Sequence, residues 1–291
     1  MKRVLFFGMT LCALLLSGCQ KNEVLENEPR SIEFRVVNYE QYVMGGTTRA
    51  ESVNVLDHLS MAVFTADTDQ LVGSVITQNK GDSGYGTFTV ALEEGTYRIV
   101  FLGYMGSKAL QMTSSKAISF ADSYVPHTFL YSETLRVDEN VAESQNIVLN
   151  RAVGAFRLVM ADAMPEGIYS VQFVSDRGGA VLNAQTGECT QNSGRSYTME
   201  LPNPSTNWWN KTGANFTLYY FLPTAGASMN LTVNALDNNG AVVKTRTFEA
   251  APMAINQLTS YTGDFFVEPS TDLSMQLSVN NEWAEEKEFT Y

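Results

Sequence analysis

The sequence is poor in the residues from which most catalytic and metal sites are built. It holds two histidines, His58 and His127, and three cysteines in 291 residues. A catalytic triad or a zinc site needs histidines near further ligands, at a recognisable spacing for zinc. Neither arrangement is visible, and the acidic turn at residues 67–69 lacks the bidentate glutamate of a calcium loop. We therefore expect a protein without catalytic residues, metal or cofactor, which is not an enzyme.

Positive charge is also scarce. The 19 Lys and Arg are outnumbered by 31 Asp and Glu, so the net charge at pH 7 is −12. Nucleic acids and anionic lipid surfaces attract clustered Lys and Arg. The charge balance therefore argues against both as partners.

Long hydrophobic runs are missing except at the N-terminus. Two basic residues precede an apolar run over residues 4–16, which is shorter than the roughly 20 residues of a membrane-spanning helix. The run ends in the sequence LSGC at positions 16–19, which resembles the lipobox of bacterial lipoproteins. We interpret residues 1–18 as a signal peptide and Cys19 as a lipidated first residue that anchors the chain in the outer membrane. The alternative is an ordinary signal peptide cut nearby.

This interpretation leaves one thiol in the mature chain. Cys12 is removed with the signal peptide and Cys19 carries lipid, so Cys189 is alone. No intramolecular disulfide is then possible. The exported protein must depend on its hydrophobic core and on hydrogen bonds between strands.

The first predicted strand follows a polar tether at residues 19–30 and covers residues 31–38. Apolar and polar residues alternate along it, which indicates a half-buried strand. The buried face is predicted to consist of Ile32, Phe34 and Val36. Residues 41–50 contain paired glycines and threonines, which predict an exposed, mobile loop. Arg49 lies at the end of this loop.

Most of the remaining chain predicts strands separated by turns, because almost no segment has a sustained helical period. Turn residues at 67–70, 92–96 and 237–240 are each flanked by apolar segments of strand length, which predicts three hairpins. Residues 108–132 are predicted as a long loop with a helical turn.

The strand pattern starts again after Asn150 and Arg151, and the second half repeats segments of the first. The predicted fold is all-β, with two tandem β-sandwich domains at residues 31–150 and 151–268. A C-terminal strand and an acidic tail follow at residues 269–291. The strand has the strictest alternation in the chain. Its apolar residues are Leu273, Met275, Leu277 and Val279.

An aromatic pair, Trp208 and Trp209, precedes Tyr219 and Tyr220 in the second half. Aromatic rings on a surface can stack on sugars, whereas aromatic residues at strand ends more often cover the core. The first alternative would make the protein an outer-membrane surface lipoprotein that binds glycans.

Several segments together resemble the type V fimbrial subunits of the Bacteroidales, a group of fimbrillin and fimbrial-anchor lipoproteins. The resemblance extends over nearly the whole chain. The matching segments are the LSGC signal, the first strand SIEFRVVN, the sequence TRA at 48–50, NIVLNRAVGAFRLVM between the predicted domains, LTSYTGDFF at 258–266 and Trp283.

The resemblance implies two transthyretin-like sandwich domains that assemble by strand exchange. An arginine-specific protease would cut after Arg49, so that Ala50 becomes the new N-terminus. The strand from Ile32 to Val36 would leave, and the C-terminal strand of a neighbouring subunit would take its place. The implied partners are other fimbrial subunits, the outer membrane through the lipid, and a ligand on a host or bacterial surface.

Two alternatives stay open at this point. Arg49 could be an ordinary exposed arginine in a flexible loop, and the last strand could close its own domain, because alternation suits either role. The expected function is a structural or adhesive component of cell-surface fimbriae. A stalk or tip subunit would lose its lipidated segment at Arg49, whereas a membrane anchor would keep it.

Overall fold

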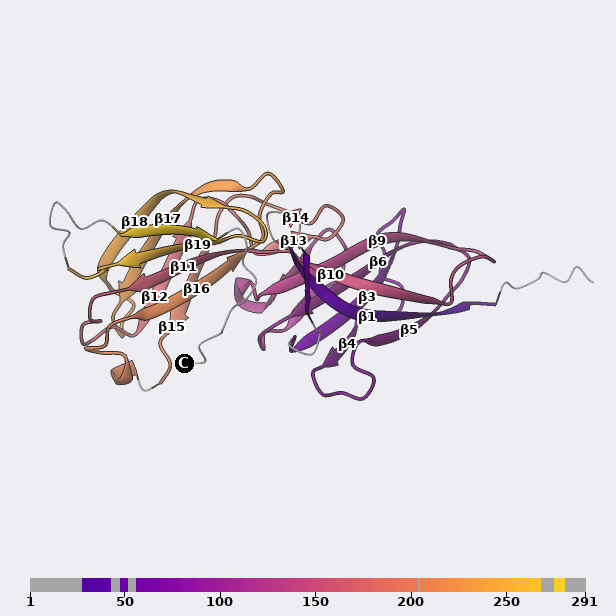
Figure 1. Cartoon of the computed structure of the whole chain (residues 1–291), viewed down its shortest axis with the longest axis horizontal. Helices are drawn as coiled ribbons and strands as arrows, with labels where there is room; N and C mark the ends of the chain where they lie inside the picture. Colours follow the sequence, from indigo (N-terminus) through magenta and orange to yellow (C-terminus); the bar gives the residue numbers. More distant parts are fainter. Residues whose placement is uncertain (1–27, 43–47, 52–55, 204, 268–274, 281–291) are drawn as a thin grey trace, which may run out of the picture.

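The computed structural model describes residues 28–42, 48–51, 56–203, 205–267 and 275–280. These residues form β-strands and two short 3-10 helices, η2 (Ala121–Ser123) and η3 (Ser205–Asn207), so the all-β prediction is confirmed. None of the described helices could cross a membrane, since each is too short. Figure 1 shows the strands in two lobes placed end to end along the longest axis. The predicted signal peptide and Cys19 lie outside the described residues.

The N-terminal half is a sandwich made by one sheet that folds over on itself. Its strands are β1 (Arg30–Tyr42), β2 (Thr48–Glu51), β3 (His58–Thr65), β4 (Ile76–Asn79), β5 (Thr87–Leu92), β6 (Gly95–Tyr104), β9 (Thr128–Val137) and β10 (Ser144–Arg151). The sheet order is β2-β1-β10-β9-β6-β3-β4, and β5 also pairs with β1. Strands β9 and β10 pair through only two residues of each strand, and this short pairing forms the corner between the two layers.

Aromatic side chains from both layers meet in the core of this half. Phe34 of β1 and Phe88 of β5 lie on one layer, and Phe101 of β6 lies on the other. The ring of Phe101 is 5.6 Å from that of Phe34 and 5.3 Å from that of Phe88, between ring centroids. Such tilted aromatic contacts add to the apolar burial that holds the layers together.

The C-terminal half is a sandwich of two separate sheets. Its strands are β11 (Gly154–Met160), β12 (Ser170–Ser175), β15 (Ser196–Glu200), β16 (Ala214–Tyr220), β17 (Ala227–Leu236), β18 (Val242–Met253), β19 (Leu258–Gly263) and β20 (Gln276–Asn280). The sheets have the orders β16-β11-β19-β20 and β15-β12-β17-β18. Phe156 of the first sheet contacts Phe173 and Phe248 of the second, at centroid distances of 6.3 and 5.5 Å.

The two halves share one topological feature. In the N-terminal half β1 pairs in parallel with β10, and in the C-terminal half β11 pairs in parallel with β19. Each of these first strands has an antiparallel partner on its other side, which is β5 for β1 and β16 for β11. The first strand of each half is therefore central in its sheet.

A small sheet and a third core join the halves. The sheet has the order β14-β13-β8-β7 and combines two strands from each half. They are β7 (Leu110–Met112), β8 (Ile118–Phe120), β13 (Val181–Asn183) and β14 (Glu188–Cys189). The core beneath includes Phe64 and Leu102 from one half and Phe221 and Leu258 from the other. The prediction of a long loop at residues 108–132 is therefore wrong, although η2 supplies the helical turn predicted within it. The predicted division after residue 150 falls one residue before the end of β10 and stays a prediction.

Two of the three predicted hairpins are present. The turn at residues 237–240 connects β17 and β18, which pair antiparallel as predicted. The turn at residues 92–96 does not form a hairpin, because β5 pairs with β1 whereas β6 pairs with β3 and β9. The short link between β5 and β6 carries the chain from one layer of the sandwich to the other. The third predicted hairpin, at residues 67–70, is present: β3 and β4 pair antiparallel, with a bridge from Phe64 to Leu71 nearer the turn.

Candidate functional site: the first and last strands

Strand β1 occupies an apolar slot between two neighbouring strands. Ile32 and Phe34 are completely buried and Val36 is nearly so, which confirms the predicted face. Burying each such side chain contributes about 1.5–3 kcal/mol. The slot is completed by side chains of β5 and β10, such as Phe88 and Ile147. The pairing of these two strands with β1 was not predicted from the sequence.

The backbone of β1 is paired on both sides over much of its length. Residues 30–35 pair antiparallel with β5, and residues 33–40 pair in parallel with β10. At the edge of these ladders, Glu33 N donates to Glu143 O at 2.8 Å and Val36 N donates to Gly86 O at 2.8 Å. Removing β1 would therefore leave two rows of unpaired peptide groups beside an exposed apolar slot.

Arg49 and Ala50 lie in a strand, which corrects the loop prediction. They belong to β2, where Arg49 is opposite Gln41 and Ala50 is opposite Glu40 of β1. Paired glycines and threonines suggested a loop over residues 41–50, but β1 continues to Tyr42 and β2 begins at Thr48. Strand β2 ends the sheet order, so its outer edge has no strand partner among the described residues. An extended segment with one open edge is the form in which a protease can bind a peptide by adding it as a strand.

The last described strand, β20, lies at the edge of its own sheet with apolar side chains on the surface. It pairs antiparallel with β19 through residues 276–280. Leu277 is 48% exposed and Val279 is 39% exposed. Met275 reaches back to Gly263 and packs partly against the core. Leu273 lies outside the described residues. The strand thus joins its own domain by backbone pairing while Leu277 and Val279 remain uncovered by that domain.

The aromatic residues proposed for glycan contact do not form one surface. Trp208 and Trp209 are half-buried before β16, and Trp209 Nε1 donates to Ile168 O at 2.8 Å. Trp208 packs against the C-terminal core. Tyr219 and Tyr220, at the far end of β16, are 6% and 0% exposed. The two tryptophans therefore lack the tyrosine neighbours that the sequence placed near them.

The titratable residues singled out in the sequence are separated and engaged in structural contacts. The ring of His58 stacks on Tyr104 at a centroid distance of 4.9 Å. His127 is buried at the junction of the halves, where burial and the charge of Arg151 lower its pKa well below the ordinary value of 6.5. Burial also raises the pKa of the Cys189 thiol, which makes it a poor nucleophile. No group of three His, Cys, Asp or Glu within the described part of the chain is placed to bind a metal ion.

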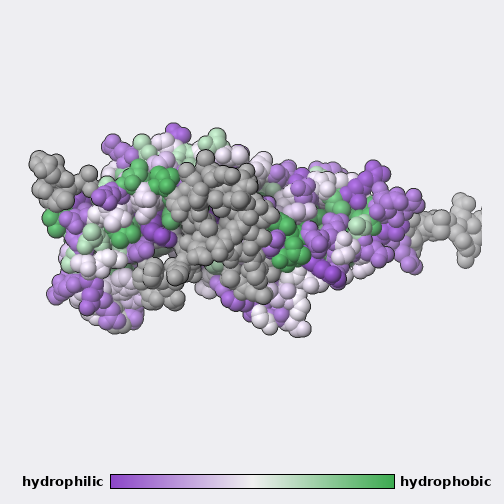
Figure 2. Space-filling model, in the orientation of Figure 1, coloured by the Kyte–Doolittle hydropathy of each residue, from purple (hydrophilic) through white to green (hydrophobic). Residues whose placement is uncertain are grey.

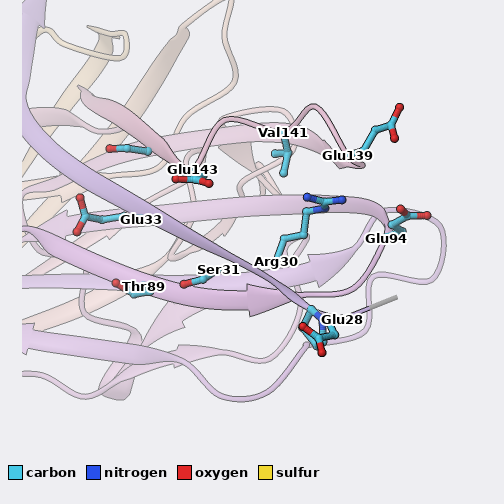
Figure 3. A pocket seen from close by; sticks show the side chains of 11 residues that line it. Glu28, Arg30, Ser31, Glu33, Thr89, Glu94, Glu139, Val141 and Glu143 are labelled. Atoms are coloured by element: carbon cyan, nitrogen blue, oxygen red, sulfur yellow. The ribbon is translucent and has the colours of Figure 1, made fainter. Parts of the chain in front are cut away.

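A polar pocket borders the start of β1. It has a volume of about 780 Å³ and is lined by β1 itself, by Thr89 of β5 and by Ser144 of β10. Figure 3 shows carboxylates around it, with Arg30 at the same end of the pocket as Glu94 and Glu139. Because the lining comes from β1 and from both of its neighbours, the pocket depends on β1 being in place.

The surface visible in Figure 2 is mostly hydrophilic over the described residues, with small and separate hydrophobic patches. The exposed apolar side chains are few and distributed over several strands. They include Val37, Ile76, Val174, Val242, Val243, Val267, Leu277 and Val279. A broad apolar face is thus absent from the part of this view that belongs to described residues.

Solved structures share this fold. A candidate adhesin from Bacteroides ovatus is 13% identical, with a TM-score of 0.50 over 85% of this chain and 96% of that protein. A candidate polysaccharide-binding protein from Bacteroides thetaiotaomicron is 12% identical, with a TM-score of 0.50 over 87% and 96%. At these identities the likeness shows the fold alone. The fimbrial anchor protein Mfa2 from Porphyromonas gingivalis is 12% identical over 87% of this chain and 98% of that protein, with a TM-score of 0.43.

Sequence comparison gives the family directly. No curated protein matches the chain significantly. Residues 32–290 match DUF6562, a family of unknown function, and this segment contains all the strands discussed above except the first two residues of β1. The chain therefore belongs to the DUF6562 family of unknown function.

Proposed function

We propose that this protein is a non-enzymatic structural or adhesive component of cell-surface fimbriae, of the type V kind, exported as a lipoprotein through Cys19. It assembles when a protease cuts after Arg49, β1 leaves its slot and the C-terminal strand of a second subunit fills it. The names of the solved structures that share the fold, a candidate adhesin and a candidate polysaccharide-binding protein, agree with a surface role.

One observation carries the proposal: the contrast between β1 and β20. Strand β1 buries Ile32 and Phe34 in a central slot, whereas β20 leaves Leu277 and Val279 on the surface. Both strands place apolar side chains at every second position, which is the spacing that the slot between β5 and β10 accepts. A donated strand would cover these apolar side chains and satisfy both rows of open peptide groups.

Proteolysis supplies the direction of the exchange. While β1 is covalently attached, its return to the slot is intramolecular and outcompetes a strand from another molecule. A cut between Arg49 and Ala50 separates β1 from the rest of the sandwich. Once β1 has dissociated, it is no longer held near the slot at a high local concentration. The C-terminal strand of a second subunit then competes with free β1 only through its affinity for the slot.

The same scheme distinguishes two roles. A stalk or tip subunit is cut at Arg49 and loses Cys19 together with β1. An anchor keeps Arg49 intact, retains its lipid in the outer membrane and offers its own C-terminal strand to the adjoining subunit.

The test is to determine the N-terminus of the protein purified from cells and to run it on unboiled gels. A start at Ala50 together with a high-mass ladder supports a polymerising subunit, and an acylated start at Cys19 supports an anchor. Arg49→Ala is expected to abolish the start at Ala50 and the ladder. Arg136→Ala, which changes an exposed arginine of β9, is the matched control.

Two results would contradict the proposal. One is a mature chain that begins elsewhere, with neither lipid on Cys19 nor a cut after Arg49. The other is a folded monomer that never enters a complex with fimbrial subunits in cells that make fimbriae. A ladder that persists in Arg49→Ala would refute the role of the cut.

A further inference from the structure

Arg195 is held between two tyrosine rings at the junction of the halves. Its Cζ lies 5.2 Å from the ring centroid of Tyr197 and 5.1 Å from that of Tyr220. Its backbone is fixed at the end of β12, since Arg195 O accepts a hydrogen bond from Ser175 N at 2.9 Å. Gly178 leaves room for this packing, because an added Cβ there would lie 3.0 Å from the Tyr220 ring.

No carboxylate in the described part of the chain pairs with the guanidinium of Arg195. Its Nε and Nη1 are buried without a hydrogen-bond acceptor among the described residues, whereas Nη2 is not enclosed in this way. Burial lowers the pKa of Arg195, although the tyrosines act in the opposite direction. A guanidinium is charged at any physiological pH, so leaving it desolvated and unpaired costs free energy that a bound anion would recover.

Side chains from the N-terminal half complete the surroundings of Arg195. Tyr124, which follows η2, lies 5.8 Å from Tyr197 between ring centroids, and both residues are half-exposed. Lys108 Nζ pairs with Asp122 Oδ2 at 2.6 Å beside them, and its charge acts on Tyr197. Two cations and one carboxylate thus meet here, in a protein whose net charge is −12.

We propose that Arg195, Tyr197 and Tyr124, assisted by Lys108, form a binding site for the carboxylate of an acidic sugar. The carboxylate accepts a charge-assisted hydrogen bond from the exposed edge of the Arg195 guanidinium. The half-exposed tyrosine rings offer an apolar face against which the C–H groups of a sugar ring pack.

The charge of the protein restricts the ligand further. A polyanionic polysaccharide would be repelled by the excess of carboxylates, whereas one terminal acidic sugar brings a single negative charge to the local positive site. Both halves of the chain contribute residues, so the site exists only when the junction is formed. Binding requires no strand exchange, and it can therefore be measured on the monomeric protein.

The experiment measures binding of glucuronate and N-acetylneuraminate to the full exported protein by calorimetry and saturation-transfer NMR. Glucose tests the need for the carboxylate, and acetate tests the need for the sugar. Saturable binding of at least one acidic sugar is expected, with neither glucose nor acetate binding comparably. Arg195→Gln should weaken binding by about 10- to 100-fold, which is the usual effect of losing a hydrogen bond to a charged group. Arg136→Gln, far from the site on β9, should bind as the unchanged protein does.

A second variant keeps the test decisive if Arg195→Gln fails to fold. Lys108→Gln changes an exposed side chain and leaves Asp122 unpaired, so it should weaken binding several-fold without altering the unfolding temperature. The proposal is overturned if neither acidic sugar binds, if glucose or acetate binds equally well, or if both Lys108→Gln and a folded Arg195→Gln leave the affinity unchanged. Loss of polymerisation would affect none of these measurements.

Discussion

Arg151 Nε donates a hydrogen bond to Nε2 of His127 at 2.9 Å, in a buried contact between β10 and the segment before β9. The same guanidinium donates through Nη1 to Asn256 Oδ1 at 2.8 Å, and Asn256 lies between β18 and β19. The His127 ring stacks on Tyr219 of β16 at a centroid distance of 5.1 Å. Arg151 and His127 therefore connect the two halves, and they do so with His127 in its neutral form, because Nε2 acts as the acceptor.

The first prediction concerns pH. The pKa of His127 is well below 6.5 in the folded protein because of burial and Arg151, and it returns to its ordinary value on unfolding. Below pH 6.5 the unfolded chain therefore binds a proton that the folded chain does not. Stability should be complete above that pH and fall as the pH decreases, by up to about 1.4 kcal/mol per pH unit. Urea unfolding between about pH 7.5 and about pH 5 measures this slope.

The variant His127→Gln isolates the contribution of this residue from that of the carboxylates. It should be less stable at neutral pH but lose less stability on acidification than the unchanged protein. Identical slopes for the unchanged protein and His127→Gln would show that His127 is protonated in the folded state.

The second prediction concerns the slot of β1. Phe34 is completely buried and contacts Phe101 across the sandwich. Phe34→Ala should lower the free energy of unfolding by about 3–5 kcal/mol, through lost burial and the cavity left behind. Arg35→Ala, one residue further on the exposed face, should change it by less than about 0.5 kcal/mol. Equal effects of the two substitutions in denaturant unfolding would mean that β1 is not seated as described.

The third prediction separates folding from assembly at β20. Leu277 and Val279 are exposed, so the double variant Leu277→Ser, Val279→Ser should leave the stability of the monomer within about 0.5 kcal/mol. If β20 is the donated strand, the same variant should abolish high-mass complexes, because a polar strand cannot fill the slot. Gln276→Ser and Ser278→Ala on the other face are the control pair. A monomer unfolded by the double variant would instead show that β20 closes its own domain.

The fourth prediction concerns the close contact at the start of β11. An added Cβ on Gly154 would lie 2.3 Å from the backbone oxygen of Ala254 and 2.6 Å from Leu222 Cδ1. Gly154→Ala should therefore cost about 1–3 kcal/mol, since a backbone atom cannot move aside as a side chain can. Gly95→Ala is the control and should cost less. Its Cβ would lie 3.2 Å from the half-buried side chain of Tyr97, which can move aside. The unfolding temperatures of the two variants test the difference.

Local patterns predicted those elements whose environment differs between their two faces. Ile32, Phe34 and Val36 alternate with polar residues, and β1 has one face in the core and one in solvent. The Asn-Gly turn before β18 likewise specified its hairpin through local backbone preferences. In both cases the determining interactions lie within a few residues along the chain.

Features that depend on distant segments could not be predicted in this way. Strands β7 and β8 have three residues each, which is too short for a recognisable pattern. They pair with each other, and β8 also pairs with β13, about 60 residues later. The exposure of Leu277 could not be predicted either. Alternation indicates that a strand has an apolar face, but it does not indicate which segment, if any, packs on that face. The surroundings of Arg195 could not be predicted from the sequence, because Tyr124 and Tyr220 are distant from it along the chain and come close only in the folded structure.

The parallel pairing of β1 with β10, and of β11 with β19, has a mechanical consequence. Since β1 and β10 run in the same direction, the chain enters the N-terminal half at one end of the sheet and leaves it at the opposite end. The pairing of β11 with β19 repeats this in the C-terminal half as far as Gly263, and β20 then runs back antiparallel to β19. A pulling force along the molecule therefore acts parallel to these strands and loads their hydrogen bonds in shear, all at once. Such a ladder must break as a unit, whereas strands pulled apart at one end would open one bond at a time.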